Sequence, residues 1–206
     1  MAFQGAAAGS FAAGLGTGLS LIVAIGAQNA FVLKQGLLRR HVFAVCLFCA
    51  LSDAALIAAG VAGAGALAAR APWFLSAMRW GGAAFLIWYG LRSARAAWRG
   101  GEALAPEGSA PPSLAATLAT IAALTWLNPH VWLDTVVLLG AVSAQSPDRV
   151  AFAAGAMTGS VLFFFSLGYG ARLLAPVFAR PAAWRVLDAG VALVMWAIAA
   201  SLILGG

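Results

Sequence analysis

Charge is scarce in this chain. Only 9% of its 206 residues are charged whereas 63% are hydrophobic, and the first charged side chain is Lys34. Soluble domains carry charge on about a quarter of their residues, so this composition excludes the soluble class. A membrane-spanning helix needs about 20 mostly apolar residues. We therefore expect an all-α integral membrane protein, with 1–206 forming a single transmembrane domain.

An early positive charge is also missing. A cleavable secretory signal begins with Lys or Arg and has a short apolar stretch. Residues 1–33 contain no charge and form a longer apolar run. We expect this segment to be retained as the first span.

Motifs for enzyme chemistry are absent as well. The chain has neither the phosphate-binding pattern GxxxxGK[ST] nor the zinc pattern HExxH, and it offers no aqueous domain to hold them. The sequence predicts that the protein is not an enzyme and uses no cofactor or resident metal. Transport through it would be driven by an ion or by the substrate gradient.

Cysteine occurs only twice, as Cys46 and Cys49. This CxxC spacing suggests redox chemistry in some soluble proteins. Here both residues lie one turn apart in an apolar helical run, where cysteine usually packs as a small hydrophobe. A membrane thiol oxidoreductase using this pair is therefore the less favoured alternative to a transporter.

The apolar residues fall into six segments separated by charges and by Pro and Gly clusters. A Gly-, Pro- and Ser-rich linker at about 93–113 divides them into two groups of three. Because three spans is an odd number, the second group must be inverted relative to the first. We predict six transmembrane helices as two inverted three-helix repeats, at about 8–92 and 114–204. The six segments are 8–33, 41–69, 72–92, 114–142, 150–174 and 183–204.

Basic residues favour one side of this arrangement by nine to three. Cytoplasmic loops of membrane proteins are enriched in Lys and Arg. We expect the basic loops to be cytoplasmic and both termini to be periplasmic, and this bias also explains the net charge of +6 without a nucleic-acid partner. The nine are Lys34, Arg39, Arg40, Arg92, Arg95, Arg99, Arg172, Arg180 and Arg185, and the three are Arg70, Arg79 and Arg149.

Two acidic residues, Asp53 and Asp134, stand within these apolar segments. A charged side chain at the centre of a membrane helix costs about 2.5–3.5 kcal/mol, so such residues are functional candidates. Asp134 follows Asn128 and Pro129 in a segment that proline interrupts, which frees carbonyl groups near Thr125. Irregular backbone at membrane depth is tolerated where it lines a cavity. We expect this stretch to be a cavity wall.

The first segment carries its own polar interruption at Gly26, Gln28 and Asn29. Paired interruptions in corresponding helices of inverted halves indicate the binding site of a transporter. The sequence predicts a polar lining here and leaves open whether the helix is broken.

Three further polar residues have competing interpretations. Ser52 stands beside Asp53, and His130 suits a structural hydrogen bond as well as a proton relay. Arg79 lies about 10 Å into its segment, a depth from which its guanidinium can reach the membrane surface. We keep these three as candidate supporting residues around the site.

Four stretches of the chain resemble one known family in order and spacing, the LysE/ArgO family of bacterial basic amino acid exporters. They are "GAQNAFVLKQG", "CALSDAALIAAGVAGAGAL", "MRWGGAAFLIWYG" and "LTWLNPHVWLDTVVLLG". The resemblance implies export of L-lysine, L-arginine or both across the bacterial inner membrane, driven by the proton motive force. Its functional aspartates correspond to Asp53 and Asp134, and its Gln-Asn and Asn-Pro motifs correspond to Gln28, Asn29, Asn128 and Pro129. The chain departs from the family at Ala27, where many members have proline.

These residues suit the chemistry of proton antiport. A cationic cargo needs a counter-charge, and a buried carboxylate can hold either a proton or a cation. We expect basic amino acids, protons and the lipid bilayer as partners, and the sequence leaves a homodimer open. The alternative cargoes are a neutral amino acid, homoserine or a metal cation.

Overall fold

A computed structural model describes residues 2–23, 26–63, 72–99 and 112–204 of the chain. Every regular element in these residues is helical. The α-helices are α1 (Ala2–Ile22), α2 (Ala27–Leu38), α3 (Val42–Val61), α5 (Pro72–Arg99), α6 (Leu114–Trp126), α7 (Pro129–Trp132), α8 (Leu139–Ala144), α9 (Arg149–Gly170) and α10 (Pro181–Leu204). A π-helix, η2 (Leu133–Leu138), and two 3-10 helices, η3 (Ala171–Leu174) and η4 (Val177–Ala179), complete the fold.

Four helical stretches in the described residues are long and apolar enough to span a membrane, namely Gly5–Ile22, Val42–Val61, Arg149–Leu174 and Pro181–Leu204. A fifth span results if α6 and the following stretch Pro129–Ala144, bent by 61°, cross together. Helix α5 carries four arginines and is not among these stretches. The chain is thus an all-helical membrane protein with four or five candidate spans, and the arrangement of six helices in two repeats stays a prediction.

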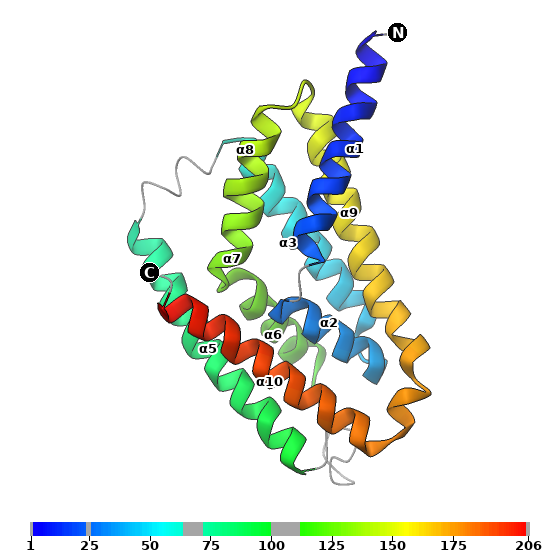
Figure 1. Ribbon diagram of the computed structural model, residues 1–206, viewed down its shortest axis with the longest axis vertical. Coiled ribbons are helices and arrows are strands. Elements are labelled where there is room, and N and C mark those ends of the chain that lie inside the picture. Colours follow the sequence, from blue (N-terminus) through cyan, green and yellow to red (C-terminus); the bar gives the residue numbers. More distant parts are fainter. Residues whose placement is uncertain (1, 24–25, 64–71, 100–111, 205–206) are drawn as a thin grey trace.

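The first apolar segment is broken into two helices. Helix α1 ends at Ile22 and α2 begins at Ala27, with residues 24 and 25 outside the described range. Gly26 precedes α2 in an extended conformation, with φ −115° and ψ 171°. In Figure 1 α2 runs across the direction of α1. The question that the sequence left open is answered, because this helix breaks immediately before its polar residues.

The second break lies between α6 and α7. Asn128 has an extended backbone, and its side chain accepts a hydrogen bond from the backbone N–H of His130 at 3.1 Å. Pro129 occupies the first position of α7, where the N–H that proline lacks is not needed. The chain then continues through η2, whose i→i+5 hydrogen bonding is rare and is often found at functional sites. The predicted interruption at Asn128 and Pro129 is confirmed as a bend.

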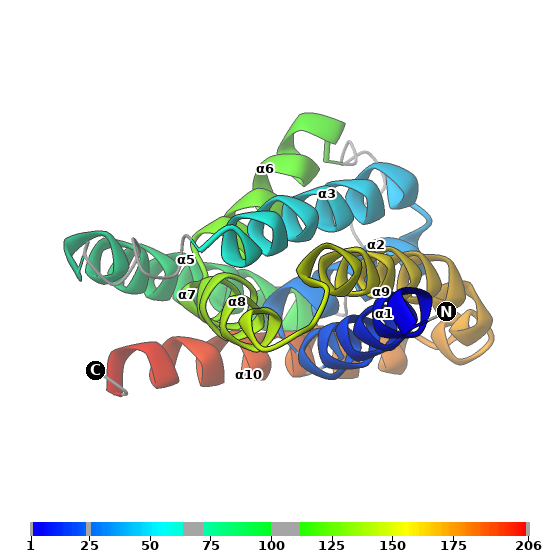
Figure 2. The same ribbon diagram turned by 90° about the horizontal axis from the view of Figure 1, so that it is seen from above.

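Close helix contacts connect the two halves of the chain. Helix α1 packs against α9, α5 packs against α10, and α3 contacts both α9 and the bent stretch from α6 to α8 (Figure 2). At Gly60 and Gly140 the backbones approach so closely that a Cβ on Gly140 would lie 2.6 Å from the carbonyl oxygen of Gly60. The small residues therefore allow the close packing expected from the sequence.

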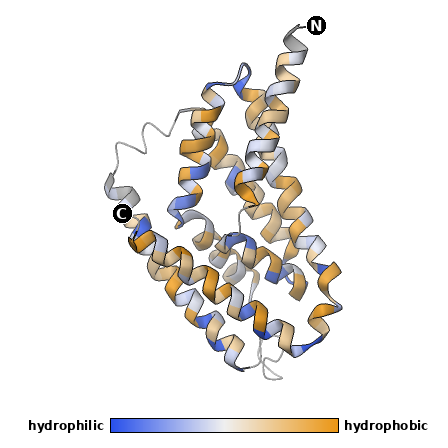
Figure 3. Ribbon diagram, viewed as in Figure 1, coloured by the Kyte–Doolittle hydropathy of each residue, from blue (hydrophilic) through white to orange (hydrophobic). Residues whose placement is uncertain are grey.

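The boundaries of the predicted linker need correction. Residues 93–99 belong to α5, which extends to Arg99. The arginines at this end are favourable there, since a positive side chain stabilises the C-terminal end of a helix. The remainder of the predicted linker at 100–111 lies outside the described residues, as does Arg70 of the charge count. Figure 3 shows most hydrophilic residues at helix ends, with further ones on α2 and on the bent stretch around α7.

The α1–α9 contact can be tested at Gly14. A Cβ at this position would overlap the carbonyl group of Phe152, whereas a Cβ at Gly16, on the same helix, meets nothing within 4 Å. We expect Gly14→Ala to lower the free energy of unfolding by about 1–3 kcal/mol, since rigid backbone has to move. Unfolding of the purified protein by SDS in detergent micelles measures this change.

The matched control is Gly16→Ala, whose Cβ meets no neighbour, so it should leave the free energy of unfolding unchanged or raise it by up to about 1 kcal/mol, because alanine favours a helix more than glycine does. Equal stability of the two variants would contradict the close approach of α1 and α9.

Candidate functional site

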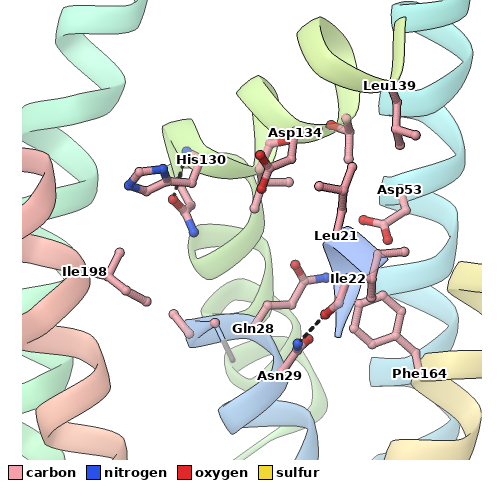
Figure 4. Close-up of a pocket in the computed structure, with 15 residues that line it drawn as sticks. Leu21, Ile22, Gln28, Asn29, Asp53, His130, Asp134, Leu139, Phe164 and Ile198 are labelled. Atoms are coloured by element: carbon pink, nitrogen blue, oxygen red, sulfur yellow. Dashed lines mark hydrogen bonds between the residues drawn. The ribbon is translucent and has the colours of Figure 1, made fainter. Parts of the chain in front are cut away.

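A cavity of about 260 Å³ lies where the two helix breaks meet (Figure 4). This volume is close to the lower end of the range of about 300–1,000 Å³ found for small-molecule sites, so it suits a small organic molecule. Its lining combines polar residues of both breaks with apolar residues of the surrounding helices: Leu21, Ile22, Gly26, Ala27, Gln28, Asn29, Asp53, Asn128, His130, Val131, Asp134, Thr135, Leu139, Phe164 and Ile198. Seven of the residues predicted from the sequence line this one cavity: Gly26, Gln28, Asn29, Asp53, Asn128, His130 and Asp134.

The amide side chains on α2 serve different purposes. Asn29 donates from Nδ2 to the carbonyl oxygen of Ile22 at 2.7 Å, so it satisfies a carbonyl left free where α1 ends. Gln28 is only 7% exposed, and its Nε2 makes no hydrogen bond. The thiol of Cys49 is its polar neighbour. Gln28 therefore offers the cavity a free N–H group. An unsatisfied buried donor costs about 1–3 kcal/mol, and a bound molecule that accepts this hydrogen bond would recover that cost.

Asp53 enters the cavity from the middle of α3. Its side chain is 3% exposed, and Oδ2 accepts a hydrogen bond of 2.7 Å from the hydroxyl of Ser160 on α9. A buried carboxylate needs such donors to remain charged. Ser160 is fully buried and was missed from the sequence, because only the packing of α3 on α9 reveals its contact with Asp53.

Asp134 enters the cavity from the opposite wall, in the first turn of η2 (Figure 4). It is half-buried, and His130 stands one turn before it on α7. The imidazole Nε2 of His130 lies 3.3 Å from the hydroxyl of Ser201 on α10. The break thus directs Asp134 toward the cavity, and His130 connects this side of the cavity to α10.

Four predicted residues lie outside the lining. Ser52 accepts a hydrogen bond from Nε1 of Trp126 at 3.1 Å, and Thr125 donates to the carbonyl of Ile121 at 2.9 Å. Pro129 forms the bend itself. Arg79 on α5 donates to the carbonyls of Leu202 and Ile203 at the end of α10 and lies over the ring of Trp80. Ser52 and Arg79 thus connect neighbouring helices, whereas Thr125 bonds within α6 and Pro129 shapes the bend.

A buried ion pair was missed by the sequence analysis. Nζ of Lys34 on α2 lies 2.5 Å from Oδ1 of Asp188 on α10, and the two side chains are 3% and 0% exposed. The prediction that Lys34 belongs to a basic loop is therefore wrong, because α2 continues to Leu38 and turns this lysine into the bundle. Asp188 could have been noticed, since it stands six residues inside the apolar stretch that starts at 183.

The two cysteines lie in the core of the bundle. Both are fully buried and unpaired, and the thiol of Cys46 donates to the carbonyl of Phe164 at 3.2 Å. A thiol oxidoreductase needs cysteines that a partner can reach. The packing therefore opposes the redox alternative.

The cavity is suited to a small organic cation that also carries polar groups. Carboxylates on facing walls provide negative charge, the amides of the two breaks provide hydrogen bonds, and residues such as Phe164 and Ile198 surround them with apolar surface. Few polar groups in a mostly apolar pocket fix the orientation of a bound molecule.

Comparison with known proteins identifies the relatives of this chain. Residues 19–206 match the family described as LysE type translocator. A putative amino-acid transporter of Mycobacterium tuberculosis is 50% identical over 88% of this chain and 90% of its own length. Arginine exporter proteins ArgO of Yersinia enterocolitica and Salmonella enteritidis are 44% and 42% identical, over 92% and 90% of this chain and 93% and 89% of their own lengths. No solved structure matches the chain.

The burial of the cysteines predicts their reactivity. We expect Cys46 and Cys49 to resist a maleimide reagent in the folded protein and to react fully after denaturation in SDS, because neither thiol is exposed. Mass spectrometry of the labelled protein measures both states. As a positive control, Val131→Cys places a thiol on the cavity wall and should react without denaturation.

Rapid labelling of the native cysteines in the folded protein would contradict their burial. It would also restore the redox alternative to consideration.

Proposed function

Because the chain belongs to the LysE type translocator family, we propose that it exports basic L-amino acids, arginine, lysine or both, across the bacterial inner membrane in exchange for protons. The family, and the relatives described as arginine exporters, indicate that the protein is a transporter and not an enzyme. The cargo and the coupling ion are inferred from the cavity, and the orientation is inferred from the distribution of basic residues.

The two carboxylates facing one cavity are the observation that carries the proposal. Asp53 on α3 and Asp134 on η2 come from different halves of the chain and line the same space. A charged group inside a membrane is expensive unless another charge compensates it. The ammonium or guanidinium group of a basic amino acid supplies that compensation.

The backbone groups of an amino acid find their partners at the helix breaks. A carboxylate accepts hydrogen bonds, and Gln28 offers a buried N–H that has no partner among the described residues. The N-terminal end of α2, beside Gly26, adds the positive end of a helix dipole. An α-carboxylate held here leaves the side chain of the cargo to extend toward the aspartates.

Proton coupling follows from competition at Asp53. A buried carboxylate can hold a proton or a cation, and the two exclude each other when one site serves both. Ser160 adapts to either form, since its hydroxyl can donate to the carboxylate or accept from the protonated acid. A cycle that carries the cargo outward and the proton inward is the antiport that we propose.

The inverted repeat is also part of the proposal. Each half contains a broken helix followed by two further helices, α1 and α2 with α3 and α5, then α6 to α8 with α9 and α10. The counterparts α3 and α9 pack against each other, as do α5 and α10, and the contact of α2 with α10 is matched by that of α7 with α5, as a two-fold axis between the halves requires. We propose six spans on this basis, with the basic loops cytoplasmic and both termini periplasmic.

Counterflow of radiolabelled arginine and lysine into proteoliposomes tests the proposed function. We expect uptake against internal unlabelled arginine, and an imposed pH gradient should drive net movement. Asp53→Asn and Asp134→Asn should each reduce exchange at least about tenfold, since losing a compensating charge costs more than about 1.4 kcal/mol.

Asp148→Asn is the matched control. Asp148 caps α9 through the backbone N–H of Ala151 and lies outside the cavity lining, and asparagine caps a helix equally well. The proposal fails if correctly inserted Asp53→Asn and Asp134→Asn proteins still exchange arginine at the wild-type rate. Exchange of neutral amino acids or divalent metal ions alone would instead support an alternative cargo.

The assignment of Gln28 has its own test. Gln28→Leu removes the free N–H at similar volume, so we expect the KM for arginine to rise about tenfold, the usual effect of losing one hydrogen bond to a charged group. Competition assays with arginine and with agmatine, its decarboxylated form, measure the effect. Agmatine lacks the carboxylate, so its inhibition constant should not change in the variant.

An equal loss of affinity for arginine and agmatine would contradict this assignment. It would show that Gln28 supports the structure of the helix break and does not bind the carboxylate of the cargo.

A further inference from the structure

Four charged side chains of the broken and third helices divide between the two halves by sign, whereas Asp53 on α3 and the remaining arginines of α5 and α10 lie outside this set. The first half contributes the cations Lys34 on α2 and Arg79 on α5. The second half contributes the anions Asp134 on η2 and Asp188 on α10. Each half therefore contributes one charge of this set from its broken helix and one from its third helix.

The charges on the third helices occupy equivalent positions. Pro72 begins α5, with Arg79 seven residues and Gly81 nine residues after it. In α10 the same spacing places Asp188 and Gly190 after Pro181. Equivalent places in the two repeats thus carry opposite charges.

The charges on the broken helices correspond in the same way. Lys34 is the fifth residue after Asn29, and Asp134 is the sixth residue after Asn128. The wider turns of the π-helix η2 accommodate the additional residue. A two-fold operation that exchanges the halves therefore converts the pair Lys34–Asp188 into the pair Asp134–Arg79.

Only the first of these two pairs is formed in the structure. Lys34 and Asp188 lie 2.5 Å apart and are buried. Within residues 26–63, 72–99 and 112–204, Asp134 forms no ion pair. Arg79 instead donates to the carbonyls of Leu202 and Ile203.

The helices that would form the second pair are already in contact. Helix α5 packs against α7, as α10 packs against α2. Gly82, less than one turn after Arg79, lies so close to the break that its Cβ would overlap the carbonyl of Leu127. An arginine at this place has a long side chain, and a rotation of the helices around the break would direct it to Asp134.

The formed pair separates the cavity from a second, smaller space. Gln28 and Asn29 line the cavity, whereas Phe31, Lys34 and Gln35 of the same helix line a pocket that also contains Arg40 and Arg92. Helix α2 thus forms a wall between the cavity and the basic end of the bundle. The ion pair fastens this wall to α10.

We propose that Lys34–Asp188 and Arg79–Asp134 are the two alternating gates of the pathway, so that one pair closes when the other opens. The inference rests on the proposed transport function and on the inverted repeat. In the structure the gate at the basic end is closed, and Asp134 is available to cargo. In the opposite state Arg79 occupies Asp134, and cargo with a similar cationic group displaces it.

Accessibility of one reporter from the two membrane faces tests the gates. Val131→Cys lines the cavity and is introduced with Cys46→Ala and Cys49→Ala, so that no other thiol is present. An impermeant maleimide is applied to right-side-out and inside-out vesicles, and the ratio of the two labelling rates is measured.

The two gates predict opposite shifts of this ratio. Lys34→Met with Asp188→Leu removes the closed pair without leaving a buried charge, so labelling from the basic face should increase several-fold. Arg79→Gln removes the second pair and should decrease labelling from that face below the wild-type rate. Lys34→Asp with Asp188→Lys and Arg79→Lys are the matched controls, which preserve attraction and should restore the wild-type ratio.

Each outcome bears on the inference. An unchanged ratio, or shifts in the same direction, would overturn it, because a loosened bundle would open both faces together. If the paired Lys34 and Asp188 variants do not insert, Arg79→Gln against Arg79→Lys decides the question alone. Counterflow in the same membranes tests the proposed function separately. Opposite shifts without arginine exchange would support the gates and reject the proposed cargo. Arginine exchange with an unchanged labelling ratio would support the cargo and reject the gates.

Discussion

The hydrocarbon core of a membrane supplies no hydrogen bonds, so every interrupted backbone and every charge in this bundle needs a partner from the protein itself. Asn29 provides one for the end of α1, and Asn128 provides another for the start of α7. Ser160 stabilises the carboxylate of Asp53, and Asp188 compensates Lys34. The cavity exists because these local partners allow two helices to break side by side, with residues of both breaks lining one space.

Close packing keeps the two breaks together. Backbones that approach through glycine, as at Gly60 and Gly140, hold α3 against the bent stretch from α6 to α8. Packed interiors deform little and tend to have discrete alternative arrangements. A bundle of this kind can therefore switch between two packings as rigid groups of helices, with the breaks as hinges and the cavity between them.

The distribution of charge connects this scaffold to its cargo. On the broken and third helices, the first half contributes the cations Lys34 and Arg79 and the second half contributes the anions Asp134 and Asp188, while Asp53 adds an acid on α3. The basic amino acid that we propose as cargo would bring a cation of the same kind into the cavity. In the gates that we propose, competition between the cargo and Arg79 for Asp134 couples binding to the arrangement of the helices.

The sequence by itself determined the membrane class, the small-residue packing and seven residues of the cavity lining, because polar groups such as Asp53 and Asn128 are costly in apolar helices and stand out one at a time. It could not identify Ser160, whose hydroxyl is ordinary until α3 and α9 pack together. It also could not pair Lys34 with Asp188, which are 154 residues apart. Only the tertiary structure decided those contacts, since the partner of a buried charge depends on which helices lie side by side and not on its neighbours along the chain.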